Sequence, residues 1–140
     1  MADLTQTPAS VGLKAQVSKN LLLVGQFGET VANGQPVYLK TADGKYWRTT
    51  TTTLAESTAV GIALTGGAAD DWGVIALPGA SVDLGATLVV AEVYAIGGAT
   101  GTIAPEADLV ASGKFPCILG YASAADTLVI NIQAAGVAIP

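Results

Sequence analysis

Short runs of β-branched, aromatic and other apolar residues recur along the chain, and glycine-rich turns separate them. Many short runs at such spacing are typical of an all-β sandwich or barrel. We therefore expect a compact β-barrel, a β-tulip-like fold or a sandwich of short antiparallel strands. The predicted strands are Leu21–Val24, Val37–Lys40, Lys45–Thr53, Ala59–Leu64, Trp72–Leu77, Thr87–Ile96, Phe115–Tyr121 and Thr127–Gln133.

The clearest local signal is the stretch GETVANGQPVYLKTADGKYWRTT, which begins at Gly28. Apolar and polar residues alternate through Val37–Lys40, and a period of two residues indicates a strand. The pair Asp43-Gly44 follows and favours a two-residue type I′ turn, which needs positive φ at both positions. Aromatic and threonine residues after the turn suit a second, half-exposed strand. The stretch predicts a β-hairpin.

The chain divides into a polar start and a β-rich remainder. Residues 1–20 are polar and weakly patterned, so we expect an extended N-terminal arm. A frayed terminus is the alternative. Residues 21–140 form a single predicted β-domain. Within that domain Pro105–Val110 has a proline and two acids in its first turn and Gly113 beyond its end, a pattern that predicts at most one short helix.

Two segments of the chain, 28–77 and 85–132, resemble each other faintly. Gly-x-Thr-Val at Gly28 resembles Gly-x-Thr-Leu at Gly85, and the residues at 60–63 resemble those at 119–122. Chance similarity among valine- and glycine-rich strands is the alternative. If the repeat is real, two similar β-halves give the domain a pseudo-twofold character.

The composition suggests that the chain self-associates. Apolar residues make up 51% and charged residues 12%, whereas soluble domains contain about 25% charged residues. A surface with so few charges consists of Thr, Ser, Gly and Ala, or part of it is buried against a partner. We expect both and infer an oligomer.

The net charge of −5 and the scattered basic residues argue against anionic partners. Nucleic-acid binding needs clustered Lys and Arg to neutralise phosphates, so we expect no nucleic acid and no membrane as partner. The first ten residues, MADLTQTPAS, lack the basic and apolar regions of a secretory signal. We therefore expect a protein that is made in the cytoplasm.

The sequence contains no histidine, which removes the commonest general base and most zinc sites. The single cysteine, Cys117, lies in an apolar run typical of a buried small side chain. Asp70-Asp71 lacks the spacing of a calcium loop. No glycine-rich phosphate motif is present. We expect no enzymatic activity, no metal and no cofactor.

Aromatic residues and one carboxylate are the remaining candidates. Tyr46 and Trp47 are adjacent on a predicted strand, so one of them points away from the core. Tyr46, Trp47 and Trp72 are candidates for ordinary packing, for anchoring an interface, or for stacking on a sugar. Glu92 falls within the predicted strand Thr87–Ile96, on the face of Leu88, Val90 and Tyr94, so its charge is exposed, paired or part of a subunit contact.

Nearly the whole chain resembles the small capsid decoration, or cement, proteins of tailed bacteriophages. The stretches that carry the resemblance are GETVANGQPVYLKTADGKYW, AVGIALTGGAADDWGVIAL and the C-terminal run VDLGATLVVAEVYAIGGATGTIAPEADLVASGKFPCILGYASAADTLVINIQAAGVAIP. Members of this family have a strand of the type G-x-T-V-x-x-G-x-x-V-Y-L, then a D-G-K turn, a G-I-A-L strand and a similar ending. The start MADLT is also similar.

The resemblance implies a β-domain that forms homotrimers on the outside of an expanded phage head, where it clamps neighbouring major capsid subunits. It implies no catalytic residues. The candidate capsid or subunit contacts are Leu4, Thr5, Val11, Leu13, Trp47, Trp72 and Glu92. The alternatives are a carbohydrate-binding β-module with weak glycan binding on a virion surface or tail, and a tail or baseplate component. An enzyme using carboxylates is a further alternative.

Overall fold

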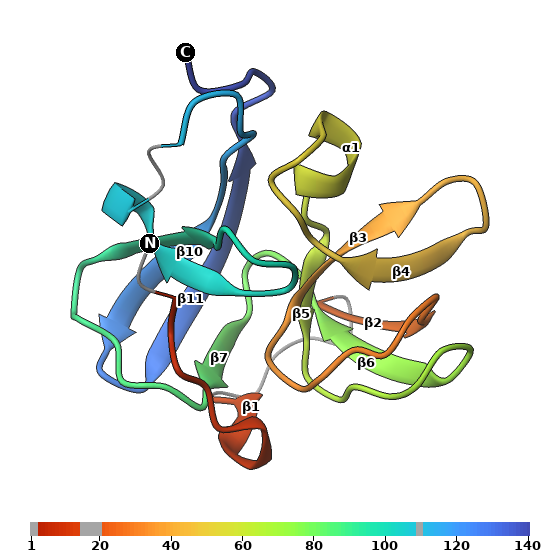
Figure 1. The fold of residues 1–140 in the computed structure, drawn as a ribbon. Helices are drawn as coiled ribbons and strands as arrows, with labels where there is room; N and C mark the ends of the chain where they lie inside the picture. The colour runs from red at the N-terminus through yellow and green to blue at the C-terminus, as the bar shows by residue number, and fades with distance from the viewer. Residues whose placement is uncertain (1–2, 15–20, 109–110) are drawn as a thin grey trace.

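The computed structural model describes residues 3–14, 21–108 and 111–140. Its regular structure is nearly all β, with eleven strands in two antiparallel sheets and one α-helix of four residues. Figure 1 shows the two sheets side by side, with the strands of the second half of the chain at the left. The predicted all-β class is therefore confirmed, and the sandwich describes it better than the barrel.

Each sheet has its own set of strands. The six-stranded sheet has the order β1 (Val11–Leu13), β7 (Ser81–Leu84), β11 (Thr127–Ala134), β10 (Cys117–Ala124), β8 (Val93–Ile96) and β9 (Ile103–Pro105). The five-stranded sheet has the order β2 (Leu22–Gln26), β6 (Trp72–Ala76), β5 (Gly61–Ala63), β3 (Pro36–Lys40) and β4 (Lys45–Arg48).

The two sheets share one topology. When β1 is set aside, the order β7-β11-β10-β8-β9 repeats the order β2-β6-β5-β3-β4, with each strand five places later in the chain. The turns after β3 and β8 also match, because Gly44 and Gly101 have φ values of +69° and +72°. This shared order supports the repeat over 28–77 and 85–132, which stays a prediction.

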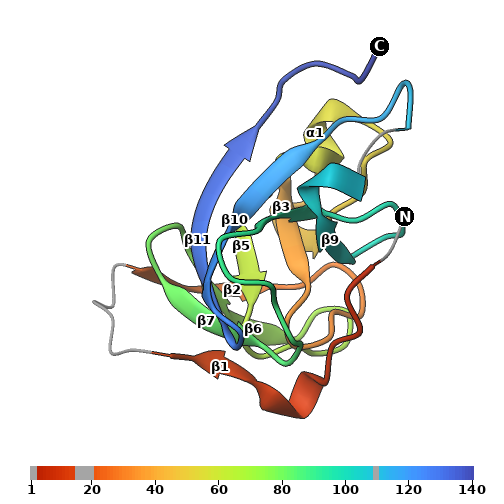
Figure 2. The same ribbon diagram turned by 90° about the vertical axis from the view of Figure 1, so that its left-hand side faces the viewer.

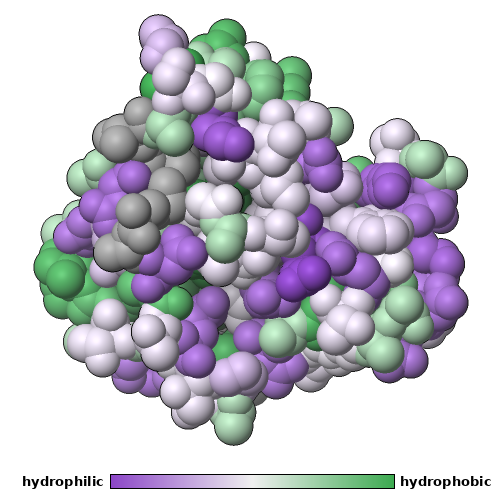
Figure 3. Space-filling model, in the orientation of Figure 1, coloured by the Kyte–Doolittle hydropathy of each residue, from purple (hydrophilic) through white to green (hydrophobic). Residues whose placement is uncertain are grey.

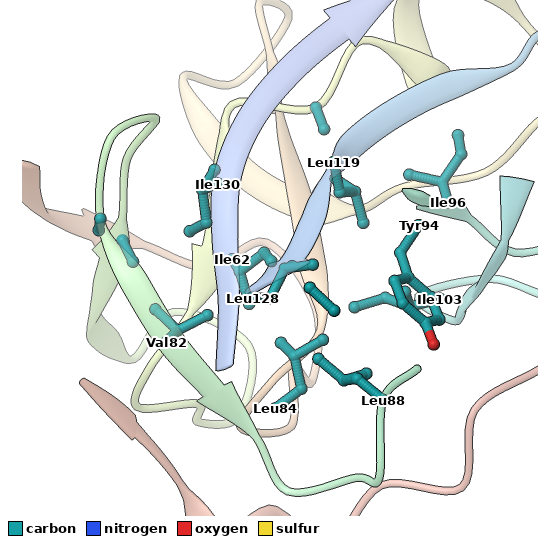
Figure 4. Close-up of a cluster of buried hydrophobic side chains, with 14 of the residues drawn as sticks. Ile62, Val82, Leu84, Leu88, Tyr94, Ile96, Ile103, Leu119, Leu128 and Ile130 are labelled. Carbon is teal, nitrogen blue, oxygen red and sulfur yellow. The ribbon is translucent and has the colours of Figure 1, made fainter. Parts of the chain in front are cut away.

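The main core lies between the two sheets. Ile62 and Ala76 of the five-stranded sheet contact the same buried cluster as Val82, Leu119 and Leu128 of the six-stranded sheet. Figure 4 shows Ile62, Val82, Leu119 and Leu128 from the two sheets gathered together, with Tyr94 and Ile103 at one side. Because strand side chains alternate between faces, each sheet also has a second face, and the two second faces differ.

The five-stranded sheet curves around its second face and buries the side chains there. Phe27, Val31, Val37, Ala63 and Ile75 form a separate buried cluster there. A single parallel bridge between Phe27 and Tyr46 joins the β2 end of the sheet to β4. The sheet therefore curls around this cluster without closing into a barrel.

The N-terminal segment is extended, but its described residues belong to the folded domain. β1 pairs with β7, Leu13 lying opposite Val82. Upstream, the N–H of Leu4 donates to the carbonyl of Ile103 at 2.7 Å, and the Gln6 amide donates to two carbonyls. The predicted extended arm therefore packs on the β-domain where it is described, over residues 3–14, and the division of the chain after residue 20 stays a prediction. Residues 1–2 and 15–20 lie outside the described residues.

The helices differ from the prediction. Glu106–Asp108 forms only a 3-10 turn, and the last two residues of the predicted Pro105–Val110 helix lie outside the described residues. The α-helix is instead α1 (Leu54–Ser57), which begins where the predicted strand Lys45–Thr53 was expected to end. Thr53 caps it, because its hydroxyl accepts from the N–H of Glu56 and donates to the Glu56 carboxylate.

Two further strand predictions need correction. Only Val93–Ile96 of the predicted strand Thr87–Ile96 is a strand, because Ala91 has a φ of +69° and turns the chain. The predicted hairpin is present, but a four-residue loop joins Lys40 to Lys45. Gly44 alone has positive φ there, so the two-residue type I′ turn is wrong.

Candidate functional site

The indole of Trp47 is engaged by its own hairpin. Its Nε1 donates to the Asp43 carboxylate at 3.1 Å, and Lys40 Nζ lies 4.2 Å from the ring centroid. The ring also lies against Gly28, where a Cβ would overlap it. A hydrogen bond from the Lys45 N–H, helped by the Trp47 indole, lowers the pKa of Asp43. Trp47 thus stabilises the loop between β3 and β4, and Lys40 and Gly28 occupy the space next to its ring.

Trp72 is the exposed tryptophan, with 65% of its surface accessible. It lies opposite Gln26, while Val24, also 65% exposed, lies opposite Val74. Alternation along β2 and β6 places all four side chains on one face of the sheet. Val24, Val74 and Trp72 therefore form a small apolar surface, called here the β2–β6 patch.

The four candidates in the N-terminal segment divide into two kinds. Leu4 and Val11 are half-buried and pack against the main core. Thr5 is exposed and lines a shallow hollow with Asp83 and Asp126. Leu13 is 39% exposed. Only Thr5 and Leu13 are therefore available for contact with a partner.

Glu92 does not lie within a strand. It precedes β8, its N–H donates to the carbonyl of Val89, and its carbonyl accepts from Ala122. The predicted common face with Leu88, Val90 and Tyr94 is wrong: Leu88 and Tyr94 are buried and Val90 is exposed. The turn at Ala91, which has a positive φ, breaks the alternation on which that prediction depended.

The seven predicted contact residues do not form one site. Trp47 lies on β4, Trp72 at the start of β6, Glu92 before β8, and the N-terminal candidates along β7 and β9. The described carboxylates with local partners hold loops in place. Asp71 accepts from the N–H of Ala68, and Asp83 accepts from the N–H of Gly85.

The sequence prediction missed a surface on the six-stranded sheet. Val93, Tyr121 and Val129 lie in one row across β8, β10 and β11, because Tyr121 is opposite both valines. Ile118 lies opposite Gln133 in a second row. These side chains point away from the main core, and Figure 2 shows β10 and β11 on the near side of the molecule. The outer face is defined by Val93, Ile118, Tyr121, Val129, Asn131 and Gln133.

The outer face is hollowed. One hollow of about 140 Å³ is lined by Val93, Gly120, Tyr121 and Asn131, together with Ile118 and Gln133. A second hollow of about 290 Å³ shares Ile118 and Gln133 and extends to Glu106. The alternation of Val129, Asn131 and Gln133 in the sequence was the signal that could have located this face.

A second apolar region adjoins it. Val89 and Val90 are 62% and 60% exposed in the connection between β7 and β8. Figure 3, drawn in the orientation of Figure 1, shows hydrophobic residues gathered at the left edge of the molecule, where Figure 1 places the connection between β7 and β8.

Residues 3–14, 21–108 and 111–140 contain no group of three residues of the metal-binding types. Burial raises the pKa of the Cys117 thiol, which holds it in the neutral form. None of the helices described here has the length and hydrophobicity to cross a membrane.

Comparisons with models of known protein families, with curated proteins and with solved structures gave no match to this chain.

Proposed function

We propose that the protein is a structural virion protein that binds the outside of a tailed-phage head as a homotrimer. It stabilises the shell by clamping neighbouring major capsid subunits. One observation carries the proposal: ordered motifs from Gly28 to Pro140 resemble those of capsid decoration proteins. The site of action is the virion surface, after synthesis in the bacterial cytoplasm.

The fold supports this proposal because the motifs that carry the resemblance build the sheets. The VYLK motif lies in β3, GIA is β5, and LGYASA and TLVINIQ lie in β10 and β11. The residues that resemble those of decoration proteins are thus residues of the strands and the cores. A resemblance at such positions favours a fold shared with those proteins over a chance similarity of turns.

The surface supports a role in assembly. Large apolar side chains are exposed on the β2–β6 patch, on the outer face and at Leu13. Exposed apolar surface of this extent favours protein contacts. Three copies in one trimer present three contacts at once, and linked contacts raise avidity well beyond that of a single one.

The β2–β6 patch is the part of the surface that we assign to the capsid. Trp72 projects from it, and large aromatic side chains are frequent anchors of protein interfaces. Truncation of such an anchor removes a large share of the binding energy, whereas truncation of an isolated exposed leucine does not.

The proposal is tested with expanded heads that lack decoration. Purified protein is added, the heads are pelleted, and both the bound protein and the temperature of DNA release are measured. We expect saturable binding and a higher release temperature. Trp72→Ala should weaken binding, whereas Leu54→Ala, a change at an exposed leucine of α1, should not. Protein that stays in the supernatant at all concentrations would exclude the decoration role.

The exposed ring of Trp72 also favours a second candidate, weak glycan binding, since a sugar can stack on an open indole. Titration with host polysaccharide should then shift tryptophan fluorescence in the wild type and not in Trp72→Phe. Trp47 is the internal comparison, because Asp43 and Lys40 engage its ring. An unchanged spectrum at saturating polysaccharide would remove this candidate.

A further inference from the structure

We propose that the outer face of the six-stranded sheet is the surface through which copies of this chain associate. The choice of face comes from the structure, while the number of three copies rests on the proposed function. The occupant of the face is a second copy of this chain.

The first argument is the absence of charge from the strands that build the face. The segments Val93–Ile96, Cys117–Ala124 and Thr127–Ala134 contain no Asp, Glu, Lys or Arg. Each copy carries a net charge of −5, so copies repel one another. Like charges brought together in a desolvated contact oppose binding strongly. A self-contact is therefore favoured where both surfaces are uncharged.

The second argument is the distribution of groups across the face. Apolar Val93 and Val129 lie opposite Tyr121 on the two neighbouring strands, Ile118 precedes it on β10, and Tyr121 is 44% exposed. Glu106 lies at the far side of the larger hollow. An apolar centre with charges only at the margin is the usual anatomy of a protein interface.

The third argument is the self-complementarity of the polar side chains. Asn131 and Gln133 are exposed on β11, and each amide contains both donors and an acceptor. An amide of this kind can pair with the same side chain on an identical surface. Charged side chains of one sign cannot do so.

The fourth argument is shape. Ile118 and Gln133 line both hollows and thus separate them as a ridge. A ridge between two hollows can interdigitate with the ridge of a second copy, which gives the close packing of a stable interface. A flat sheet surface would lack this fit.

The β2–β6 patch is the competing surface, because its strands are also uncharged. Acids lie at the margins of both surfaces, because Asp70 and Asp71 precede Trp72 and Glu92 precedes Val93. Asp70 is paired with Lys45, so charge does not separate the two surfaces. They differ in extent: the patch offers three apolar side chains on two strands, whereas the outer face spans three strands and has two hollows. The outer face therefore suits a second copy better.

The test introduces one charge into each surface. Tyr121→Glu changes the outer face, and Val24→Glu makes the same charge change at an exposed strand position in the β2–β6 patch. The molar mass is measured by light scattering on a size-exclusion column, and circular dichroism with urea unfolding checks that each variant folds. We expect the wild type at about 42 kDa, three times 13.9 kDa. Tyr121→Glu should elute at 13.9 kDa, and Val24→Glu should retain the wild-type mass.

A milder variant covers the case in which Tyr121→Glu fails to fold. Asn131→Asp adds a charge at an exposed position with almost no change in shape. The dissociation constant from a dilution series should rise roughly tenfold or more. A monomeric wild type would overturn the proposal. So would an oligomer that survives both outer-face variants but is lost in Val24→Glu.

Head binding separates this inference from the proposed function. If outer-face charges dissociate the oligomer but the wild type ignores undecorated heads, the interface stands and the decoration role fails. If the wild type binds heads and both outer-face variants keep the full mass, the decoration role stands and this interface fails.

Discussion

Gly61 on β5 and Gly120 on β10 each lie against a backbone carbonyl of the neighbouring strand. A Cβ at Gly61 would overlap the carbonyl oxygen of Ala76 on β6, and a Cβ at Gly120 would overlap that of Val129 on β11. The strand pairs β5–β6 and β10–β11 are equivalent in the shared strand order. Each of these two strand pairs therefore needs a glycine where its two backbones approach closely.

Substitution of either glycine should destabilise the fold. Gly61→Ala and Gly120→Ala force the neighbouring strand to move, and overpacking of this kind costs about 1–3 kcal/mol. Gly12→Ala on β1 is the matched control, because a Cβ there meets no atom within 4 Å. Urea unfolding measures the three free energies. Equal stability of Gly120→Ala and the wild type would contradict the close approach.

The N-terminal segment should contribute to stability before any partner binds. Leu4→Ala and Val11→Ala remove half-buried contacts with the main core and should each cost about 1–2 kcal/mol, below the cost for a fully buried leucine. Leu13→Ala should change the free energy of unfolding by less than about 0.5 kcal/mol, as is usual for exposed positions. Three equal effects near zero would mean that the segment is a free arm.

The cap of α1 gives a third prediction. Thr53→Ala removes the hydroxyl that accepts from the Glu56 N–H, and loss of such a cap costs about 1 kcal/mol. Thr52→Ala changes the neighbouring exposed threonine and should have little effect. The difference between their urea midpoints checks the assignment, and a Thr52→Ala variant as unstable as Thr53→Ala would contradict it.

The ion pair between Lys14 and Asp126, 2.8 Å apart, predicts a dependence of stability on pH. The mutual hydrogen bond lowers the pKa of Asp126 and raises the pKa of Lys14. The carboxyl contribution is present above its unfolded pKa, near 3.8, and is lost as pH falls through the folded value. The lysine contribution is present below its unfolded pKa, near 10.5, and is lost as pH rises through the folded value.

Lys14→Met should therefore be less stable than the wild type near neutral pH, and the difference should vanish in strong acid. Lys114→Met changes the net charge equally and is the control. Thermal unfolding at a series of pH values measures both. If the two variants differ from the wild type by the same amount at every pH, the ion pair makes no specific contribution.

The sequence predicted the elements with strong local signals. The strand Thr127–Gln133 was recognised because its alternation is regular, and β11 extends it by one residue. The hairpin around Asp43 was also recognised. The length of its loop was not predicted. The Asp43 side chain accepts a hydrogen bond from the Lys45 N–H, and this turns the chain while the backbone φ of Asp43 stays negative.

The errors arose where tertiary structure overrides weak patterns. The run Thr87–Ile96 is apolar enough for a strand, yet Ala91 adopts positive φ and Leu88 turns into the core. β7 was missed because SVDL is short and its neighbour β1 comes from the N-terminal segment. The outer face depends on β8 and β10 lying beside β11, and no local pattern contains that order.

The most direct test of the whole account is the molar mass of the purified protein, measured by light scattering on a size-exclusion column with and without undecorated expanded heads. The account predicts about 42 kDa for the protein alone, three copies of 13.9 kDa, and co-elution with heads once they are added. A stable species of 13.9 kDa that elutes apart from the heads would contradict it.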